Sequence, residues 1–517
     1  MIATTAGLCA QAQTAPASAS AARVPTDNPP WYPSLQAFEH YDSARSHVFS
    51  EATFDGSLTG PNRVDLQRSR PGAYPSGYNT AYLDSKDMFI QGGSYGNIKG
   101  SIGPYVAKVN PRTLRPIWYT QLRNTRRTRE WDYPGGMAIM DDGFIYVVSG
   151  YRIYKVSPKH GRVVKTLRLP TMVHMRNNYP ETPPTYDEET WTQDARNTSY
   201  NGINALPDGT IILKSLYRQA GCKRNGPSAI LNCPKTRDVP ASILVSVDPK
   251  TMRIRDKITL PAFAGARPTI TRYHGVDYVY LLENTSSPVR YSVKNGQFTL
   301  DESWTPPALP AKYENQTTGG SLIIMNNWVL GATNSVPAGG HLTMFAINQN
   351  DASDVLYSQP YANDPVPPLL SRAFEKAAAG ETQAVSWAGM SLEADPANGL
   401  FYGVETLARK VAAFRIGPEG IETVWEKPQT TTEWATLIGP KDHRIWVGTN
   451  IPGAQIPGQN HNDTIVYRDA ATGRLLAVSG RVPAMTPGSA IQPGYNGSVF
   501  FPGAKGTLVK ATPHPAG

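Results

Sequence analysis

The chain repeats one unit of four short apolar runs. The clearest copy lies between Trp131 and Pro170 (WDYPGGMAIMDDGFIYVVSGYRIYKVSPKHGRVVKTLRLP). Its runs are separated by Asp-Asp-Gly, Ser-Gly and Pro-Lys-His-Gly, and such turn residues between apolar runs indicate strands joined by tight turns. Four consecutive strands of this kind form an antiparallel meander. A meander repeated every ~40–50 residues predicts an all-β propeller.

Eight copies of the unit can be followed from about Asn79 to Pro513. The last copy, Ser489–Pro513, has only three runs, which would leave an open strand edge. We therefore expect an N-terminal strand at Asn62–Arg68 to complete that blade and close the ring. Seven blades are the alternative if the last copy is not a blade of its own.

The segments outside the repeats divide the rest of the chain. We interpret residues 1–25 as the remnant of a signal peptide or a disordered leader, and residues 26–78 as an N-terminal segment that carries the closing strand. Residues 79–513 form the single propeller domain. Two insertions, at 171–197 and 217–240, interrupt its rhythm, and long loops on a rigid scaffold are where function concentrates.

The N-terminus and the cysteines together predict export. The start MIATTAGLCAQAQTAPASASAA is rich in small residues and resembles the back half of a secretory signal peptide. Cys222 and Cys233 lie in one insertion, and in an oxidising compartment such a local pair predicts a disulfide. We expect a periplasmic or secreted protein; two free thiols in a cytosolic protein are the alternative.

Composition excludes several classes of partner. The net charge of +9 is not gathered into one stripe, and no nucleic-acid-binding module is present, so we predict no nucleic-acid partner. No apolar run reaches the ~18 residues of a membrane span. The predicted partner is a small molecule or glycan at the mouth of the axial channel, or another protein.

Two of the repeat turns resemble those of the quinoprotein-like propeller superfamily, whose repeats carry Asp-x-x-Thr-Gly followed by Trp. The matching residues are Asn110–Thr113 with Trp118, and Asp469–Gly473. This resemblance implies a fold and no activity. Quinone-dependent alcohol dehydrogenases resemble one another in a vicinal Cys-Cys pair beside pyrroloquinoline quinone. This sequence has no such pair, which argues against that cofactor.

A second, local resemblance is to the gluconolactonase-like calcium propellers. The run Ser199–Leu213 (SYNGINALPDGTIIL) is similar to that family's Asn-Gly strand opening, and this implies Asn201 as a calcium ligand, with Glu130 and Glu433 as further ligands. Hard cations prefer such oxygen ligands. The family's next Asp is missing, because blade four opens with Arg267. Alternatively, Asn201 and Asn204 only satisfy backbone groups of turns.

Residues at the starts of innermost strands are the predicted site. They are expected to meet at one end of the channel: Glu130, Asp132, Asn201, Asn204, Arg267, Trp387, Glu433 and Trp434. Three carboxylates there would repel one another without a cation, an arginine or raised pKa values. Arg267 pointing into the cluster would indicate an ion-paired plug or an anion pocket. The tryptophans are alternatively packing residues between blades.

No catalytic motif of high specificity is evident in this sequence, and H-E-x-x-H does not occur. We therefore predict an exported propeller that binds a ligand or a partner at its axial mouth. The alternatives are a metal-dependent, lactonase-type hydrolase and a quinone-dependent oxidoreductase. Because propellers host all of these functions, the fold alone does not choose between them.

Overall fold

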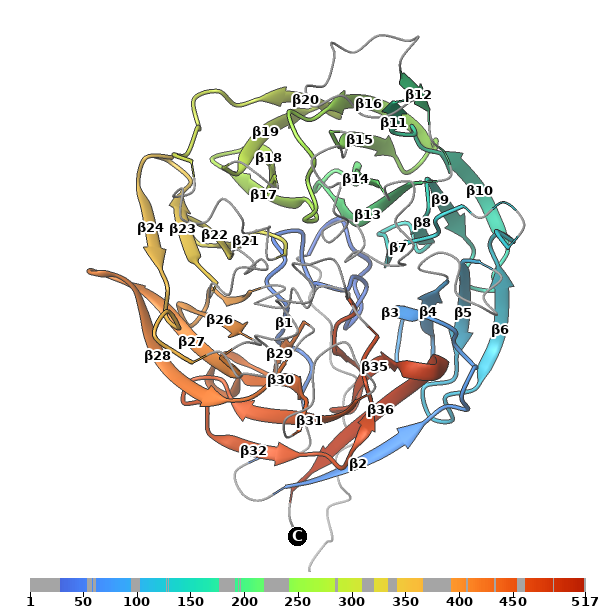
Figure 1. Ribbon diagram of the computed structural model, residues 1–517. Coiled ribbons are helices and arrows are strands. Elements are labelled where there is room, and N and C mark those ends of the chain that lie inside the picture. Colours follow the sequence, from blue (N-terminus) through green and yellow to red (C-terminus); the bar gives the residue numbers. More distant parts are fainter. Residues whose placement is uncertain are drawn as a thin grey trace, which may run out of the picture.

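The computed structural model is a closed ring of eight blades around a central axis (Figure 1). The structure describes residues 28–53, 58, 62–93, 103–126, 128, 130–175, 191–193, 195, 197–217, 241–283, 287–308, 320–332, 342–365, 392–405, 408–431, 434–452, 461–486 and 488–515. The predictions for Cys222, Cys233, Trp387 and Glu433 lie outside these residues.

Each blade is a four-stranded antiparallel sheet whose first strand lies nearest the axis. From the axis outward, the first four blades are β3 (Gly77–Tyr82), β4 (Met88–Gly92), β5 (Tyr105–Val109) and β6 (Pro116–Gln121); β7 (Pro134–Ile139), β8 (Ile145–Ser149), β9 (Arg152–Val156) and β10 (Val163–Arg168); β13 (Thr198–Ala205), β14 (Ile211–Tyr217), β15 (Ile243–Asp248) and β16 (Arg253–Thr259); and β17 (Thr269–Tyr273), β18 (Val276–Leu281), β19 (Val289–Lys294) and β20 (Gln297–Leu300).

The other four blades follow the same order. They are β21 (Ile323–Met325), β22 (Trp328–Ala332), β23 (Met344–Asn348) and β24 (Val355–Ser358); β25 (Glu393–Asp395), β26 (Leu400–Glu405), β27 (Lys410–Gly417) and β28 (Gly420–Pro428); β29 (Thr436–Ile438), β30 (Ile445–Asn450), β31 (Asn462–Asp469) and β32 (Leu475–Val478); and β34 (Gln492–Pro493), β35 (Val499–Gly503), β36 (Thr507–His514) and β2 (Arg63–Arg68).

The predicted closure of the ring is confirmed. Strand β2 pairs antiparallel with β36, from Arg63 opposite His514 to Arg68 opposite Val509, and supplies the outer strand of blade eight. The prediction of eight blades is therefore right. The reason given for the closure also holds, because the N-terminal strand covers the edge that three strands would leave open.

Four short strands and two 3-10 segments complete the described elements. They are β1 (Val48–Phe49), parallel to β29; the hairpin of β11 (Val173–Met175) and β12 (Trp191–Gln193) between blades two and three; β33 (Val482–Pro483), which pairs with β31; and the 3-10 segments Lys441–His443 and Ala504–Gly506. Among the described residues, no helix is long and apolar enough to cross a membrane.

Tryptophans on the outer strands join neighbouring blades through the repeated turns. Trp425 of blade six donates its indole N–H to the Ala470 carbonyl in a turn of blade seven at 2.8 Å. A Cβ placed on Gly473 of that turn would lie 2.7 Å from the Trp425 ring, so only glycine leaves room there, and its φ of +69° also favours glycine. Gly161 faces Trp118 in the same way between blades one and two. The recurring turn and tryptophan therefore have a structural role, which is to pack neighbouring blades together.

Candidate functional site: a plugged axial channel

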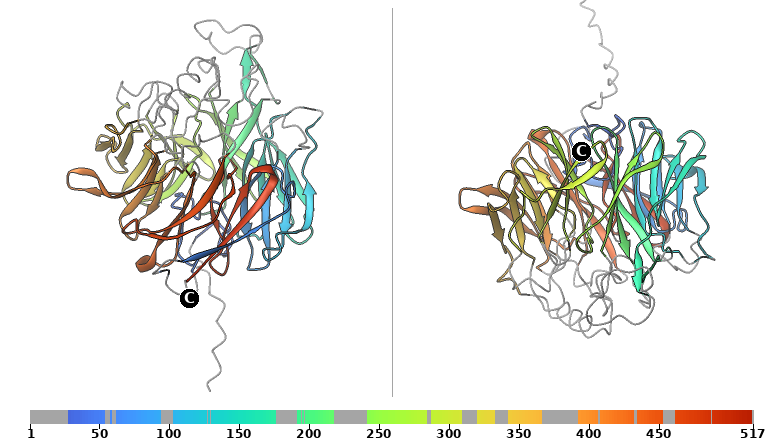
Figure 2. Two further views of the ribbon diagram at one scale, coloured as in Figure 1. Left: turned by 60° about the horizontal axis from the view of Figure 1, so that its bottom comes forward. Right: turned by 90° about the horizontal axis from the view of Figure 1, so that it is seen from above.

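The N-terminal residues 28–53, which we call the axial plug, lie inside the ring (Figures 1 and 2). The inner edge of every first strand carries backbone groups with no further strand to pair with. The plug supplies partners for these groups. Backbone amides on six first strands donate to plug carbonyls: Tyr82 to Gln36, Ile139 to Ala37, Ile270 to Ser43, Ile324 to Ala44, Ala394 to Ser46 and Leu437 to His47, at 2.7–3.2 Å.

Blade three contacts the plug through side chains. Asn204 donates from Nδ2 to the Ser43 carbonyl at 2.9 Å and to the Pro268 carbonyl at 3.1 Å, and Ser43 Oγ donates to the Ala205 carbonyl at 2.8 Å. Asn204, predicted for the channel mouth, therefore faces the axis but binds the plug and the neighbouring blade.

The plug is fixed by buried aromatic residues as well as by hydrogen bonds. Phe38 and Phe49 are fully buried, and Trp31 stacks on Phe38 with ring centroids 4.2 Å apart. Three non-glycine residues of the plug adopt left-handed backbone angles, Tyr41 at φ 71°, Arg45 at φ 62° and His47 at φ 62°. Such angles cost energy, so tertiary contacts must hold them.

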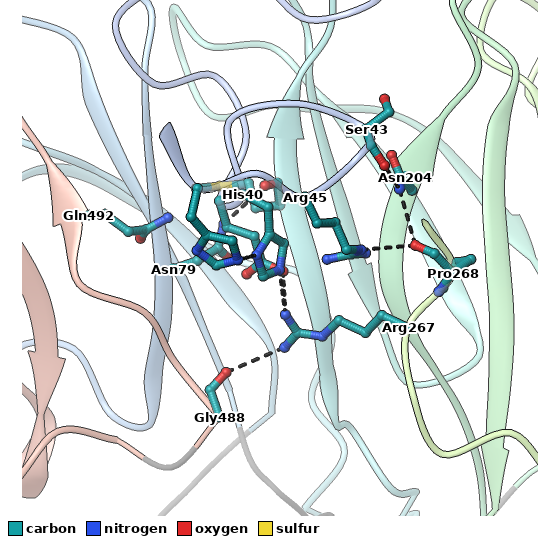
Figure 3. A network of polar contacts seen from close by, with 12 residues as sticks. His40, Ser43, Arg45, Asn79, Asn204, Arg267, Pro268, Gly488 and Gln492 are labelled. Atoms are coloured by element: carbon teal, nitrogen blue, oxygen red, sulfur yellow. Dashed lines mark hydrogen bonds and ion pairs between the residues drawn. The ribbon is translucent and has the colours of Figure 1, made fainter. Parts of the chain in front are cut away.

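Polar side chains of the plug meet one arginine of the ring in what we call the axial cluster: Glu39, His40, Arg45, His47 and Arg267 (Figure 3). Arg267 immediately precedes strand β17. Its Nη1 donates to Glu39 Oε1 at 2.7 Å and to His40 Nε2 at 2.8 Å, and its Nη2 donates to the Gly488 carbonyl at 3.3 Å. Arg267 thus ties the plug to blades four and eight.

The two histidines join the backbone of Ala435 to the ion pair of Arg267 and Glu39. His47 Nδ1 faces the Ala435 carbonyl at 3.2 Å, and since a carbonyl only accepts, this nitrogen carries a proton. His47 Nε2 contacts His40 Nδ1, and His40 Nε2 lies 2.8 Å from Arg267 Nη1 and 2.9 Å from Glu39 Oε1. Burial lowers the pKa of both histidines well below the usual value, and the charge of Arg45 lowers both further.

Arg267 also packs between aromatic rings. Its guanidinium carbon lies 4.2 Å from the centroid of the Trp434 ring and 5.4 Å from that of Tyr78. A Cβ placed on Gly202 would lie 2.5 Å from the Arg267 Cβ, so the backbone beside Asn201 touches the same side chain. The predicted residues Arg267, Trp434 and Asn201 are therefore brought together at the starts of the first strands.

The predicted acidic residues of blade two have partners of their own. Glu130 forms ion pairs with Arg123 at 2.8 Å and Arg152 at 2.7 Å, which engage its two carboxylate oxygens. Asp132 accepts a hydrogen bond from Thr125, and burial raises its pKa to about 7. Arg152 begins the third strand of the blade, so this group of residues extends away from the axis.

The described part of the chain holds no group of three or more His, Cys, Asp and Glu residues that could bind a metal ion. Of the three predicted metal ligands, Glu130 is ion-paired and Glu433 lies outside the described residues. Asn201 Oδ1 is buried, and no described residue donates to it. The calcium site that the lactonase resemblance implies remains a hypothesis.

From the sequence we did not predict the plug or the four plug residues of the axial cluster. We did name Arg267, and we gave an ion-paired plug or an anion pocket as what an inward-pointing Arg267 would indicate. The segment FEHYDSARSHVF carries aromatic, histidine and charged residues outside any repeat. This composition differs from that of the leader, residues 1–25, which is rich in small residues, and the difference could have indicated that the segment is part of the folded protein.

Comparison with known proteins shows the fold. No known family profile and no curated protein matches this chain. Among solved structures, the quinohemoprotein alcohol dehydrogenase of Comamonas testosteroni is 12% identical, with a TM-score of 0.52 over 95% of this chain and 81% of that chain. The two chains share the β-propeller fold. The quinohemoprotein alcohol dehydrogenase ADHIIG of Pseudomonas putida HK5 agrees, with 10% identity and a TM-score of 0.50 over 92% and 80% of the two chains.

The lactonase resemblance gains little from the comparisons. A putative 6-phosphogluconolactonase from Bacteroides uniformis is 14% identical, with a TM-score of 0.39 over 75% of this chain and 94% of that chain. A score this low does not argue for a shared site. The resemblance to quinoprotein-like propellers thus holds at the level of the fold, and activity must be argued from the site.

A buried carboxyl beside the plug gives a first testable prediction. Glu393 on β25 is fully enclosed, and burial raises its pKa to about 8, above the usual 4.5. The folded protein therefore holds this proton while the unfolded chain releases it, and the resulting stabilisation is lost as the pH rises from about 4.5 through 8. We expect Glu393→Gln to gain stability relative to wild type by on the order of 3 kcal/mol between pH 5 and pH 8.

Chemical denaturation of both proteins across this pH range measures the difference. Glu302→Gln, at an exposed position, is the matched control and should stay parallel to wild type. A difference between Glu393→Gln and wild type that does not change with pH would contradict the prediction.

Proposed function

We propose that this chain is an exported binding protein that takes a small molecule at the open mouth of its axial channel. The plug backbone pairs with first strands from their second residue onward, and plug side chains reach Arg267 just before β17, so the mouth that we propose lies beyond Arg267. Long connections link β14 to β15 and β24 to β25, and the strand ends that they join lie at the face where the first strands start. Long connections of a propeller favour binding at the face that carries them.

Three buried polar atoms at the mouth carry the proposal. They are Tyr78 Oη, Asn201 Oδ1 and Trp434 Nε1, and none has a hydrogen-bond partner in the described structure. The Tyr78 and Trp434 rings both lie against the Arg267 guanidinium, and Asn201 precedes Gly202, whose backbone adjoins Arg267. Buried polar groups are normally paired, so such atoms together favour a ligand with both donors and acceptors. A hydroxyl-rich molecule such as a sugar has this chemistry, and the adjoining aromatic rings suit it.

The experiment is a titration of intrinsic tryptophan fluorescence with a panel of monosaccharides, oligosaccharides and polyols. For a ligand that binds, we expect Trp434→Phe and Asn201→Ala each to weaken affinity roughly three- to tenfold, the effect of one hydrogen bond. Trp118→Phe, on the outer strand of blade one, is the control and should bind as wild type. Equal affinity of all four proteins would place the ligand elsewhere.

The enzymatic alternatives have less support from the site. The chain has no vicinal cysteine pair, so its sequence gives no support to a quinone-dependent reaction. The lactonase alternative needs calcium. Metal analysis of the purified protein tests it directly, because one calcium per chain would favour the hydrolase over the binding protein.

Export is part of the proposal and has its own test. Cys222 and Cys233 are expected to form a disulfide in an oxidising compartment. Thiol titration of the denatured, unreduced protein isolated from its native compartment should find neither cysteine reactive. Two reactive thiols would argue against both the disulfide and export, and alkylation after reduction provides the positive control.

A further inference from the structure

Arg45 of the plug is a buried cation with an incomplete set of partners. Its side chain is 0% exposed. Nε donates to the Pro268 carbonyl at 2.9 Å, and the guanidinium carbon lies 5.7 Å from the centroid of the Phe38 ring. Nη1 and Nη2 are buried, and no described residue accepts a hydrogen bond from either of them. A buried charged group left in this state is costly by several kcal/mol.

The nearby carboxylates are already engaged. Glu39 accepts from Arg267 at 2.7 Å. Asp42 accepts from the Ser46 amide at 2.9 Å and from Ser46 Oγ at 2.7 Å. Neither is hydrogen-bonded to the Arg45 guanidinium. The charges of both raise the pKa of Arg45, against the larger effects of burial and Arg267, and the pKa is lowered to about 9. Arg45 is therefore still a cation at neutral pH.

A second buried basic side chain lies near Arg45. Lys214 is fully buried and donates to the carbonyls of Ala264 and Gly265. Burial, and then the charge of Arg45, lower the pKa of Lys214 well below its usual value. The backbone of Arg45 is held at φ 62°, so the fold keeps this side chain in place at an energetic cost.

We propose that Arg45 binds a small monovalent anion, of halide or formate size, enclosed between the axial plug and the first strands. The two Nη groups offer a fork of donors to one anion. The anion would supply the acceptors that these groups lack and offset the positive charge of Arg45. It would also stabilise the closed position of the plug. This site lies beneath Arg267 and is distinct from the ligand site proposed at the mouth.

The test compares melting temperatures in sodium bromide, formate and gluconate at fixed pH and ionic strength. Gluconate is too large for an enclosed site and serves as the reference anion. For wild type we expect a saturable rise in melting temperature with bromide and formate, as expected for a ligand that binds only the folded state. Arg45→Met should lose this rise, whereas Arg253→Met, at an exposed position, should keep it. Equal responses of wild type and Arg45→Met would overturn the proposal.

A second measurement does not depend on whether Arg45→Met folds. Crystals of the wild-type protein purified and grown in bromide should show an anomalous peak within hydrogen-bond distance of the Arg45 Nη atoms. A well-ordered Arg45 without such a peak would overturn the proposal. Either failure leaves the fluorescence test at the mouth unaffected, so the two sites are judged separately.

Discussion

A chain that begins at residue 54 should fail to form a stable ring. It would lose six hydrogen bonds from first-strand amides to the plug and the burial of Trp31, Phe38 and Phe49. At about 1 kcal/mol for each hydrogen bond and about 1.5–3 kcal/mol for each large apolar side chain, the loss reaches ~10 kcal/mol. That is comparable to the whole stability of a typical domain.

Thermal unfolding followed by circular dichroism measures this effect. The matched control is a chain that begins at residue 28, which retains all described residues and should melt as the full chain does. Deletion up to Arg70 also removes β2 and should be at least as damaging. If the chain beginning at residue 54 melts at the same temperature as the one beginning at residue 28, the plug does not contribute to the stability of the ring.

Arg267→Met should cost about 3–5 kcal/mol of stability, the effect of removing one partner of a buried ion pair. Glu39 would stay buried without its cation, and the contact with the Trp434 ring would lose its charge. Arg272, five residues later on β17, offers a matched control. It pairs with Asp277 at 2.8 Å, as Arg267 pairs with Glu39 at 2.7 Å, but its side chain is 53% exposed.

We expect Arg272→Met to change stability by no more than about 1 kcal/mol, because solvent screens an exposed pair. Urea denaturation of wild type and both variants gives the comparison. Similar losses in the two variants would mean that burial of the Arg267 pair has no special consequence, and the axial cluster would then not hold the plug.

The repeated part of the chain was predictable because its pattern is local. Apolar runs, turn residues and recurring tryptophans each specify a strand or a contact within one or two blades, and the missing strand of blade eight followed from the need to cover an edge. The plug was not predictable in this way. Its residues have no period of their own, and Tyr41, Arg45 and His47 adopt backbone angles that only the surrounding ring stabilises.

The candidate site was predictable in part, because the local repeat pattern fixes where each first strand starts. Arg267 and Trp434 stand at the starts of first strands, where the repeat places them near the axis. Their partners Glu39 and His40 are more than 220 residues away in the sequence from Arg267, and no local pattern joins them. Glu130 also lies near the start of a first strand, but its carboxylate forms ion pairs with Arg123 and Arg152 and does not join the axial cluster.

Hydrogen exchange of the full-length protein tests the central claim, that residues 36–49 plug the channel. Peptides that cover this segment should exchange as slowly as peptides from the first strands β3, β7 and β25, because exchange of both requires the ring to open. The amides of Tyr82, Ile139 and Ala394 should become faster in a chain that begins at residue 54. Rapid exchange across residues 36–49 in the full chain, while the first strands stay protected, would contradict the plugged channel.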